Sequence, residues 1–234
     1  MRNPKWHRDE LILALDLYFQ LKPGQIHARN PLIIELSETI NSLPLFEEKP
    51  DAERFRNPNG VGLKLSNFLA LDDTYAGKGM SSSSKLDKVI FDEFKDQKPL
   101  LHNLANAIKE SVKNPEIAKS ILSTNDVEID PNFSRMEGTL LYRYHLSRER
   151  NPTLVKKKKE LALKKYSKLE CELCSFNYEK AYGNAGAGFM ECHHKNPLHT
   201  LVENTKTSLD DLMLVCANCH RMLHRGWKFK ITNK

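Results

Sequence analysis

Two C-x-x-C pairs in the last third of the chain constrain its fold more than any other feature of the sequence. Cys171 and Cys174 form the first pair, and Cys216 and Cys219 form the second. A C-x-x-C turn directs both thiolates toward one ion, and two such turns complete a tetrahedral zinc site. Four sulfur ligands leave no open coordination position, so we expect a structural zinc ion that holds the fold and does no chemistry. Residues 175–215 are then an insertion within this zinc frame.

The other interpretations of such cysteines are a redox pair, disulfide bonds or a chance spacing. Residues 1–10 are charged and lack the apolar stretch of a signal peptide, and no run approaches the roughly 18–20 apolar residues of a membrane helix. We therefore expect a cytoplasmic protein without a membrane partner, in which thiols stay reduced and C-x-x-C pairs bind metal. Cys192, in the strand-like run 188–193, is interpreted as a small core residue rather than a fifth ligand.

Histidines gather around the same segment. His193 and His194 are adjacent at the end of the strand-like run, where neighbouring side chains point to opposite faces. His220 and His224 are four residues apart in a helical pattern and share one helix face. One histidine of the adjacent pair can therefore join this second pair around an ion, while the other faces a substrate. Three ligands, open coordination positions and a free imidazole are the layout of a metal-assisted hydrolase, in which the ion polarises a phosphate and the histidine activates water.

The two runs that carry these residues resemble the HNH (ββα-metal) endonucleases, and among them the McrA-like modification-dependent restriction nucleases. Gly188–Leu198 is similar to the first strand and catalytic loop of that family, and Leu209–His224 is similar to its second strand and helix. The similarity covers residues 169–225. Arg148–Asn151, with the lysines that follow it, also resembles the segment that precedes this nuclease module.

The resemblance implies a role for each residue of the site. His194 matches the general base, His193 the metal ligand that precedes it, and His220 the ligand at the start of the helix. His224 matches an additional ligand of the colicin-like branch. Asp211 stands where the family has asparagine, and its carboxylate either only braces the catalytic loop or also contacts the ion. The catalytic ion is expected to be Mg²⁺, Mn²⁺, Ni²⁺ or Zn²⁺, because availability favours the first and imidazole ligands favour the last two.

The positive charge of the chain is unevenly placed. The formal net charge is +6, and residues 143–168 hold ten basic side chains against two acidic ones. Such a segment suggests a polyanion as partner, here double-stranded DNA, although a merely solvated helix face is an alternative. The residues expected to contact DNA phosphates are Arg148, Arg150, Lys156, Lys157, Lys158, Lys159, Lys164 and Lys165.

The hydrophobic pattern before the zinc frame predicts helices. Residues 6–19 are apolar on nearly every side, which is typical of a buried helix. Asn30-Pro31 and Ser84 are typical helix starts. Residues 138–150 fit either a strand or a helix, and Asn151-Pro152 begins a basic helix that runs to about residue 168.

The chain is therefore expected to be of the α+β class, with a helical N-terminal domain followed by a small zinc-framed ββα-metal nuclease module. We expect a DNA-recognition domain over 1–97, a helical linker region over 98–150, and the HNH nuclease domain over 151–234. A nuclease module of this size grips the DNA backbone, so selectivity should lie in the N-terminal domain. The residues expected to read the DNA are Arg54, Arg56, Asn57 and Asn59, although Arg56–Gly60 can equally be only a turn that starts a helix.

Together these patterns predict a metal-dependent DNA endonuclease. By its resemblance it is a restriction enzyme that acts on modified DNA, with 5-methylcytosine, hydroxymethylcytosine or phosphorothioate as the modification. A DNA-binding regulatory protein with a degenerate nuclease module is the main alternative, and a purely structural zinc protein that binds another protein is a second. One such module cuts one strand, so double-strand cleavage would require a homodimer or two binding events.

Overall fold

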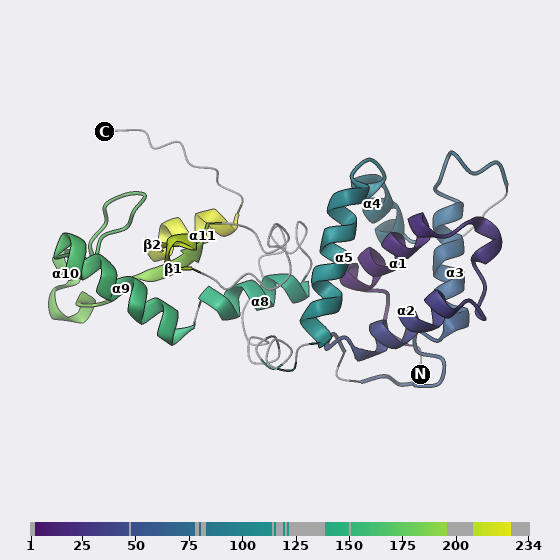
Figure 1. Ribbon diagram of the computed structural model, residues 1–234, viewed down its shortest axis with the longest axis horizontal. Coiled ribbons are helices and arrows are strands. Elements are labelled where there is room, and N and C mark those ends of the chain that lie inside the picture. The colour runs from purple at the N-terminus through teal and green to yellow at the C-terminus, as the bar shows by residue number, and fades with distance from the viewer. Residues whose placement is uncertain are drawn as a thin grey trace. The chain divides into compact units, whose positions relative to one another are not determined.

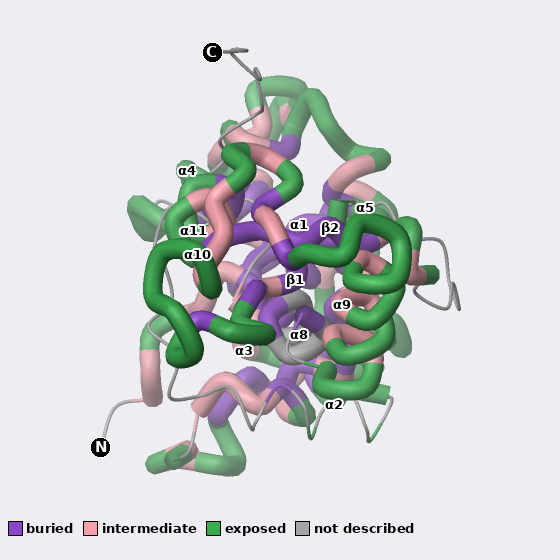
Figure 2. The backbone as a smooth tube through the Cα atoms, turned by 90° about the vertical axis from the view of Figure 1, so that its left-hand side faces the viewer, coloured by how far each residue is buried: buried purple, intermediate pink, exposed green. Residues whose placement is uncertain are grey.

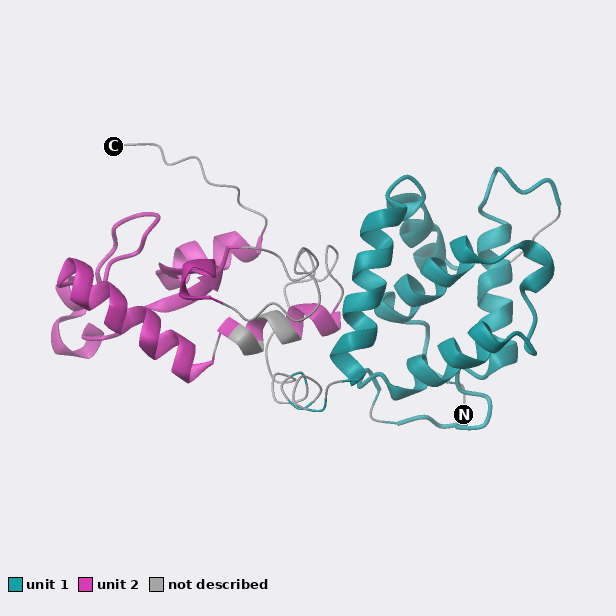
Figure 3. Ribbon diagram, in the orientation of Figure 1, with its two compact units in different colours: residues 1–122 teal, residues 123–234 magenta. Residues whose placement is uncertain are grey.

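The computed structural model describes most of the chain as two compact units, residues 1–122 and residues 123–234 (Figure 3). Each unit is described by itself below. The described residues are 3–46, 48–77, 80, 83–113, 115, 119, 121, 139–149, 151–195 and 208–225. None of the described helices is long and apolar enough to cross a lipid bilayer.

The N-terminal unit is built around one buried helix. Helix α1 (Arg8–Gln20) packs against α2 (Pro31–Ser42), α3 (Pro58–Leu69), α4 (Lys85–Phe94) and α5 (Lys98–Lys113) (Figure 1). The short 3-10 helix η1 (Pro23–Gln25) follows α1. Because four helices cover α1, its apolar residues from 11 to 15 have no exposed surface, as the sequence predicted for a helix that is apolar on nearly every side.

Side-chain caps begin these helices where the sequence predicted helix starts. The Asn30 side chain accepts a hydrogen bond from the Leu32 N–H, with Pro31 at the first helical position. Ser84 and Asp87 form a reciprocal capping box at the start of α4. These two predicted helix starts are confirmed.

Arg56 is buried in this unit, which corrects its expected role as a DNA-reading residue. Its guanidinium donates two hydrogen bonds to the Glu10 carboxylate, at 2.7 and 2.9 Å, and only 6% of the side chain is exposed. The guanidinium also lies 4.5 Å from the ring centres of Trp6 and Phe55. Asn57 instead caps α3 by accepting from the Gly60 N–H. These two residues hold the fold, which is the turn interpretation of this segment.

The second unit contains α8 (Thr139–Glu149), α9 (Pro152–Tyr166), α10 (Tyr178–Tyr182) and α11 (Ala217–His224), so residues 139–149 of the ambiguous segment are helical. Strands β1 (Glu191–His194) and β2 (Leu212–Val215) form an antiparallel two-stranded sheet in the described part of this unit, with Cys192 opposite Leu214. The 3-10 helices η2 (Gly183–Gly186) and η4 (Leu209–Asp211) precede the two strands.

The small sheet forms the core of this unit together with one face of α9. Leu169, Met190, Cys192 and Leu214 form a buried cluster against Val155 of α9, which confirms that Cys192 is a core residue. All four residues of β2 are buried, whereas α9 contains no buried residue and presents much of its length to solvent (Figure 2). Gly186 lies against the backbone of Tyr178, where a Cβ atom would come within 2.1 Å of the carbonyl oxygen.

The division between the two units falls after residue 122, inside the segment 98–150 that is expected to be a linker. Helix α5 belongs with the N-terminal unit because Leu101, Leu104 and Ile108 are buried on one stripe. Helix α8 belongs with the C-terminal unit and contacts β1. The segment that was expected to be a linker thus contributes a helix to each unit, while the functional division between the units stays a prediction.

Candidate metal centres

The four paired cysteines come together at one point in the C-terminal unit. Their sulfur atoms all lie within 4.8 Å of one another. The Sγ atoms of Cys174 and Cys216 are 3.7 Å apart, close to the ~3.8 Å that separates sulfurs placed about 2.3 Å from one zinc ion in a tetrahedron. Cys216 directly follows β2 and caps α11 by accepting from the Cys219 N–H at 3.4 Å. These residues fit a closed, structural zinc site.

The pKa values of two thiols in this frame are shifted in opposite directions. Burial alone would raise the pKa of Cys171, but backbone N–H groups, including that of Cys216, lower it below its usual range. Burial, together with the neighbouring thiols Cys174 and Cys216, raises the pKa of Cys219. Four thiolates this close repel one another, and a dication would remove that repulsion.

A second group of donors lies in the same unit, on β1, on α11 and at the end of α8. The ligand atoms of Glu149, His193, His220 and His224 also lie within 4.8 Å of one another. On β1 the side chains of His193 and His194 alternate between a half-buried and a buried face, so only His193 joins the group. The i, i+4 spacing on α11 brings His220 Nε2 within 2.9 Å of His224 Nε2.

The Glu149 carboxylate lies at the centre of the three imidazoles. Its Oε1 atom is 2.7 Å from Nδ1 of His193. Its Oε2 atom is 3.0 Å from Nε2 of both His220 and His224. We call Glu149, His193, His220 and His224 the carboxylate–histidine group. Three imidazoles and a carboxylate are a donor set that suits a divalent first-row metal ion.

A hollow opens beside the carboxylate–histidine group. It has a volume of about 470 Å³, and its lining includes Glu149, Glu191, His220, Arg221 and His224. The four-cysteine site is closed by its ligand count, whereas Glu149, His220 and His224 of the second group line this hollow.

The segment that carries both cysteine pairs and the three histidines of the second group matches a known family. Residues 171–226 match the family model described as HNH endonuclease. This part of the chain is an HNH endonuclease domain. No curated protein and no solved structure matches the chain.

Within the HNH domain, a second carboxylate holds His220. Glu191 Oε2 lies 2.6 Å from His220 Nδ1, on the opposite side of the ring from Glu149. Burial lowers the pKa of His220, but hydrogen bonds with Glu149 and then Glu191 outweigh it and raise the pKa to about 9. The bond to Glu191 fixes the ring so that Nε2 points at the carboxylate–histidine group, which is the usual arrangement behind a metal-bound histidine.

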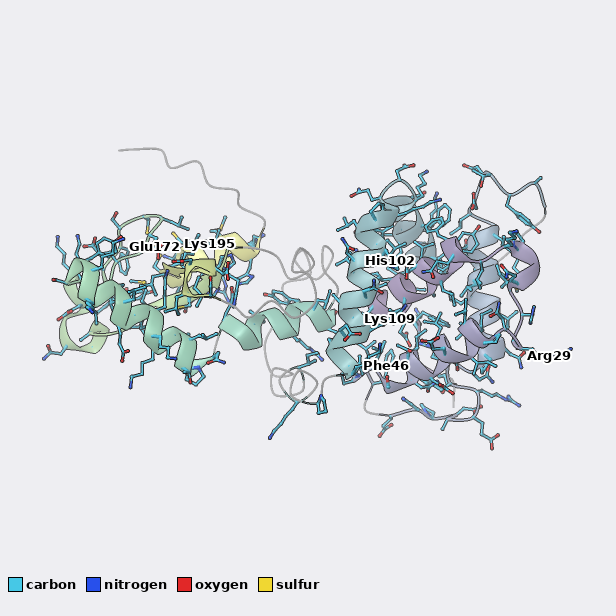
Figure 4. The ribbon with its side chains drawn as sticks, in the orientation of Figure 1. Arg29, Phe46, His102, Lys109, Glu172 and Lys195 are labelled. Atoms are coloured by element: carbon cyan, nitrogen blue, oxygen red, sulfur yellow. The ribbon has the colours of Figure 1, made fainter. Side chains whose placement is uncertain are left out.

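His194 is the last residue of β1, and Asp211 directly precedes β2. His194 is 4% exposed and lies on the opposite strand face from His193, as the alternation predicted. Asp211 accepts from the N–H and the hydroxyl of Ser208 through its carboxylate, and from the Lys195 N–H through its carbonyl. Figure 4 labels Lys195 next to the sheet. Asp211 is in neither donor group of the described residues, which favours the bracing interpretation.

The basic helix α9 divides into two kinds of lysine. Lys158 Nζ donates to the Leu209 carbonyl at 3.0 Å, and Lys159 Nζ donates to the Gly188 carbonyl at 2.9 Å. These two lysines therefore tie α9 to the HNH domain. The exposed lysines are Lys156, Lys157, Lys164 and Lys165. The Arg148 side chain and Arg150 lie outside the described residues.

Two site residues were missed by the sequence reasoning. Glu191 lies two residues before His193, and the period of a strand already places both side chains on one face. Glu149 is one of two acidic residues in the basic segment 143–168, and an acid retained among so many bases is the signal that could have found it.

Proposed function

We propose that the protein is a metal-dependent DNA endonuclease. The observation that carries this proposal is the convergence of His193, His220 and His224 beside an open hollow within an HNH endonuclease domain. When bound there, a divalent ion would polarise the scissile phosphodiester and stabilise negative charge on the leaving oxygen. The ion is Mg²⁺, Mn²⁺, Ni²⁺ or Zn²⁺, and the imidazole ligands favour the later metals of this series.

The residues of the chain divide the remaining work. His193, His220 and His224 would hold the ion, and Glu191 orients the His220 ring. His194 accepts a proton from the attacking water at a ring nitrogen, while its strand position keeps it off the face that holds the ligands. Asp211 braces the turn before β2 and, through the Lys195 N–H, the residue after His194.

The exposed lysines of α9 supply the DNA-binding surface of this proposal. Lys156, Lys157, Lys164 and Lys165 would contact phosphates without reading sequence. Selection of the site falls to the N-terminal helical unit, where Arg54 keeps 83% of its side chain exposed. The resemblance to McrA-like nucleases supports modified DNA as the substrate of a restriction enzyme.

Nicking of supercoiled plasmid tests the proposal. The protein is incubated with plasmid and each of the four ions in turn, with a chelator as the blank and His220→Ala as the inactive variant. Matched plasmids with and without 5-methylcytosine, hydroxymethylcytosine or phosphorothioate test the substrate class. Metal-dependent nicking only of a modified plasmid supports the whole proposal, and equal nicking of all plasmids removes the restriction of modified DNA from it.

A gel-shift experiment separates the alternatives if no plasmid is nicked. Binding of DNA without cleavage under any of the four ions would identify a regulatory DNA-binding protein with a degenerate nuclease module. Absence of both binding and cleavage would identify a structural zinc protein.

A further inference from the structure

We propose that Glu149, which lies outside the HNH domain, is the fourth protein ligand of the catalytic ion and fastens helix α8 to that domain. This inference rests on the metal site of the proposed function. It adds a carboxylate ligand from a segment that the family model does not cover, since the matched residues begin at 171. It also assigns α8 a role in assembling the site.

The Glu149 carboxylate lies among the other three donors. Glu149 is the last residue of α8, and its side chain is 2% exposed. One oxygen reaches His193 at 2.7 Å and the other reaches His220 and His224 at 3.0 Å. A carboxylate with two oxygens is one of few side chains that can lie within 3.0 Å of three imidazoles on two different elements.

Burial of the Glu149 carboxylate carries a free-energy cost that must be compensated. A carboxylate removed from water is stable only where positive charge or several hydrogen bonds compensate it. Imidazoles that act as metal ligands are neutral, so His193, His220 and His224 would contribute no charge in the loaded site. A divalent ion supplies the missing charge, and the loaded group then keeps a net charge of about +1 toward a phosphodiester.

The separations between the donor atoms of the carboxylate–histidine group are close to those around a single ion. Divalent first-row ions bind imidazole nitrogen and carboxylate oxygen at about 2.0–2.2 Å, so donors around one ion lie at most about 4.4 Å apart. The four donor atoms lie within 4.8 Å of one another, so small side-chain rotations bring them all onto one ion. The carboxylate oxygen is the hardest of these donors, and it should matter most for Mn²⁺ and less for Ni²⁺ or Zn²⁺.

Contacts of Glu149 and Tyr142 also link helix α8 to β1 and α11. Glu149 Oε1 also accepts the backbone N–H of His194 at 3.1 Å, so the same carboxylate holds the end of β1. Tyr142, one further residue of α8, places its ring edge-on to His224, with ring centres 5.7 Å apart. An ion bound to Glu149 would therefore restrain α8, β1 and α11 together.

The test is a binding titration that does not depend on cleavage. Mn²⁺ is titrated into the full-length protein by calorimetry and by loss of the free-ion electron paramagnetic resonance signal, for the natural sequence and for Glu149→Gln. The amide keeps the shape and a hydrogen-bond acceptor but loses the charge. We expect Mn²⁺ affinity to fall on the order of 100-fold and Ni²⁺ affinity to fall less, in line with losses seen around metal sites.

Glu160→Gln is the matched control. Glu160 is the other acidic residue of the basic segment, its side chain is 61% exposed, and its substitution changes the net charge equally. Mn²⁺ affinity should stay within twofold of the natural protein in this variant. Equal affinity of Glu149→Gln and Glu160→Gln for Mn²⁺ would overturn the proposal.

Hydrogen exchange on the natural protein provides a second measurement should Glu149→Gln fail to fold. Saturating Mn²⁺ should slow exchange of backbone amides in residues 139–149 as well as in α11. Slowing confined to α11 and β1 would show that α8 contributes no ligand and would overturn the proposal. Mn²⁺ binding that depends on Glu149 in a protein that never nicks DNA would refute the nuclease function and leave this inference standing.

Discussion

Glu172 and Leu214 exchange hydrogen bonds in both directions. The Glu172 N–H donates to the Leu214 carbonyl at 2.8 Å, and the Leu214 N–H donates to the Glu172 carboxylate at 2.8 Å. Glu172 lies inside the first cysteine pair and is labelled beside the sheet in Figure 4, and Leu214 lies two residues before Cys216 on β2. These two hydrogen bonds hold the two cysteine pairs together independently of a shared ion.

The first prediction concerns the zinc frame. The natural protein should contain one zinc ion per chain that resists chelation, and Cys171→Ser should lose this ion. The C-terminal unit of the variant should unfold, because binding of structural zinc supplies about 10–16 kcal/mol of folding free energy. Elemental analysis and thermal unfolding measure both effects. Cys192→Ala is the control: it removes a buried sulfur from the core but should leave the zinc content unchanged. Retention of the zinc by a double variant that carries both Cys171→Ser and Cys216→Ser would refute this site.

The second prediction separates the lysines of α9. Lys156→Ala with Lys157→Ala should weaken binding to every DNA sequence about equally and reduce the log–log salt slope by roughly 0.9 per lost phosphate contact. Thermal stability should not change, because both side chains are exposed. Salt-dependent binding by fluorescence anisotropy is the measurement. Weaker binding to a single sequence only would place these lysines on a reading surface instead.

The comparison protein for this experiment is a double variant that carries both Lys158→Ala and Lys159→Ala. These lysines donate to the carbonyls of Leu209 and Gly188, so their loss should lower the free energy of unfolding by about 0.5–1.5 kcal/mol for each hydrogen bond. An unchanged unfolding transition in this variant would mean that the two bonds contribute nothing to stability.

The helices were predictable where the signal is local. The apolar run of α1, the Asn30-Pro31 start and the Ser84 cap each depend on residues within one or two turns of one another. The role of Arg56 was not predictable in this way, because Glu10 lies 46 residues away and only the fold brings them together. An arginine in a polar turn is usually exposed, and this one is covered by the rings of Trp6 and Phe55.

The same difference applies to the metal centres. The cysteine pairs and the i, i+4 histidines are local patterns with a fixed geometry, so the sequence predicted both donor sets in large part. Glu149 is separated from His220 by 71 residues and joins the group only because α8 packs against β1. Long-range contacts of this kind require knowledge of the packing, which periodicity within one element does not contain.

The third prediction is a pH dependence of the N-terminal unit. Burial, and then the hydrogen bond to Asp72 at 2.7 Å, raise the pKa of Tyr18 above its ordinary value of about 10. In the unfolded chain Tyr18 loses its proton near pH 10, whereas in the folded protein it keeps it to higher pH. The free energy of unfolding should therefore fall as the pH rises above about 10.

Tyr18→Phe tests this dependence by urea denaturation between about pH 8 and about pH 11. The variant should be less stable by about 0.5–1.5 kcal/mol at neutral pH, where the bond to Asp72 is lost, and its stability should decline less steeply at alkaline pH. Tyr166→Phe is the control, because Tyr166 is 59% exposed. Parallel alkaline declines in Tyr18→Phe and the natural protein would contradict the prediction.

The fourth prediction assigns the proton transfer to His194. His194→Gln, which retains the approximate volume of this buried side chain, should reduce the rate of metal-dependent DNA cleavage by ~10²–10⁴-fold, the usual contribution of a general base. Affinities for Mn²⁺ and for DNA should stay near those of the natural protein, because the ligands lie on the opposite strand face and the exposed lysines lie on α9. Single-turnover cleavage with saturating ion is the measurement, and His27→Gln in the N-terminal unit controls for the same substitution outside the C-terminal unit. A cleavage rate equal to that of the natural protein would move the general-base role to another residue, whereas loss of Mn²⁺ binding together with cleavage would show that His194 acts on the ion and not on water.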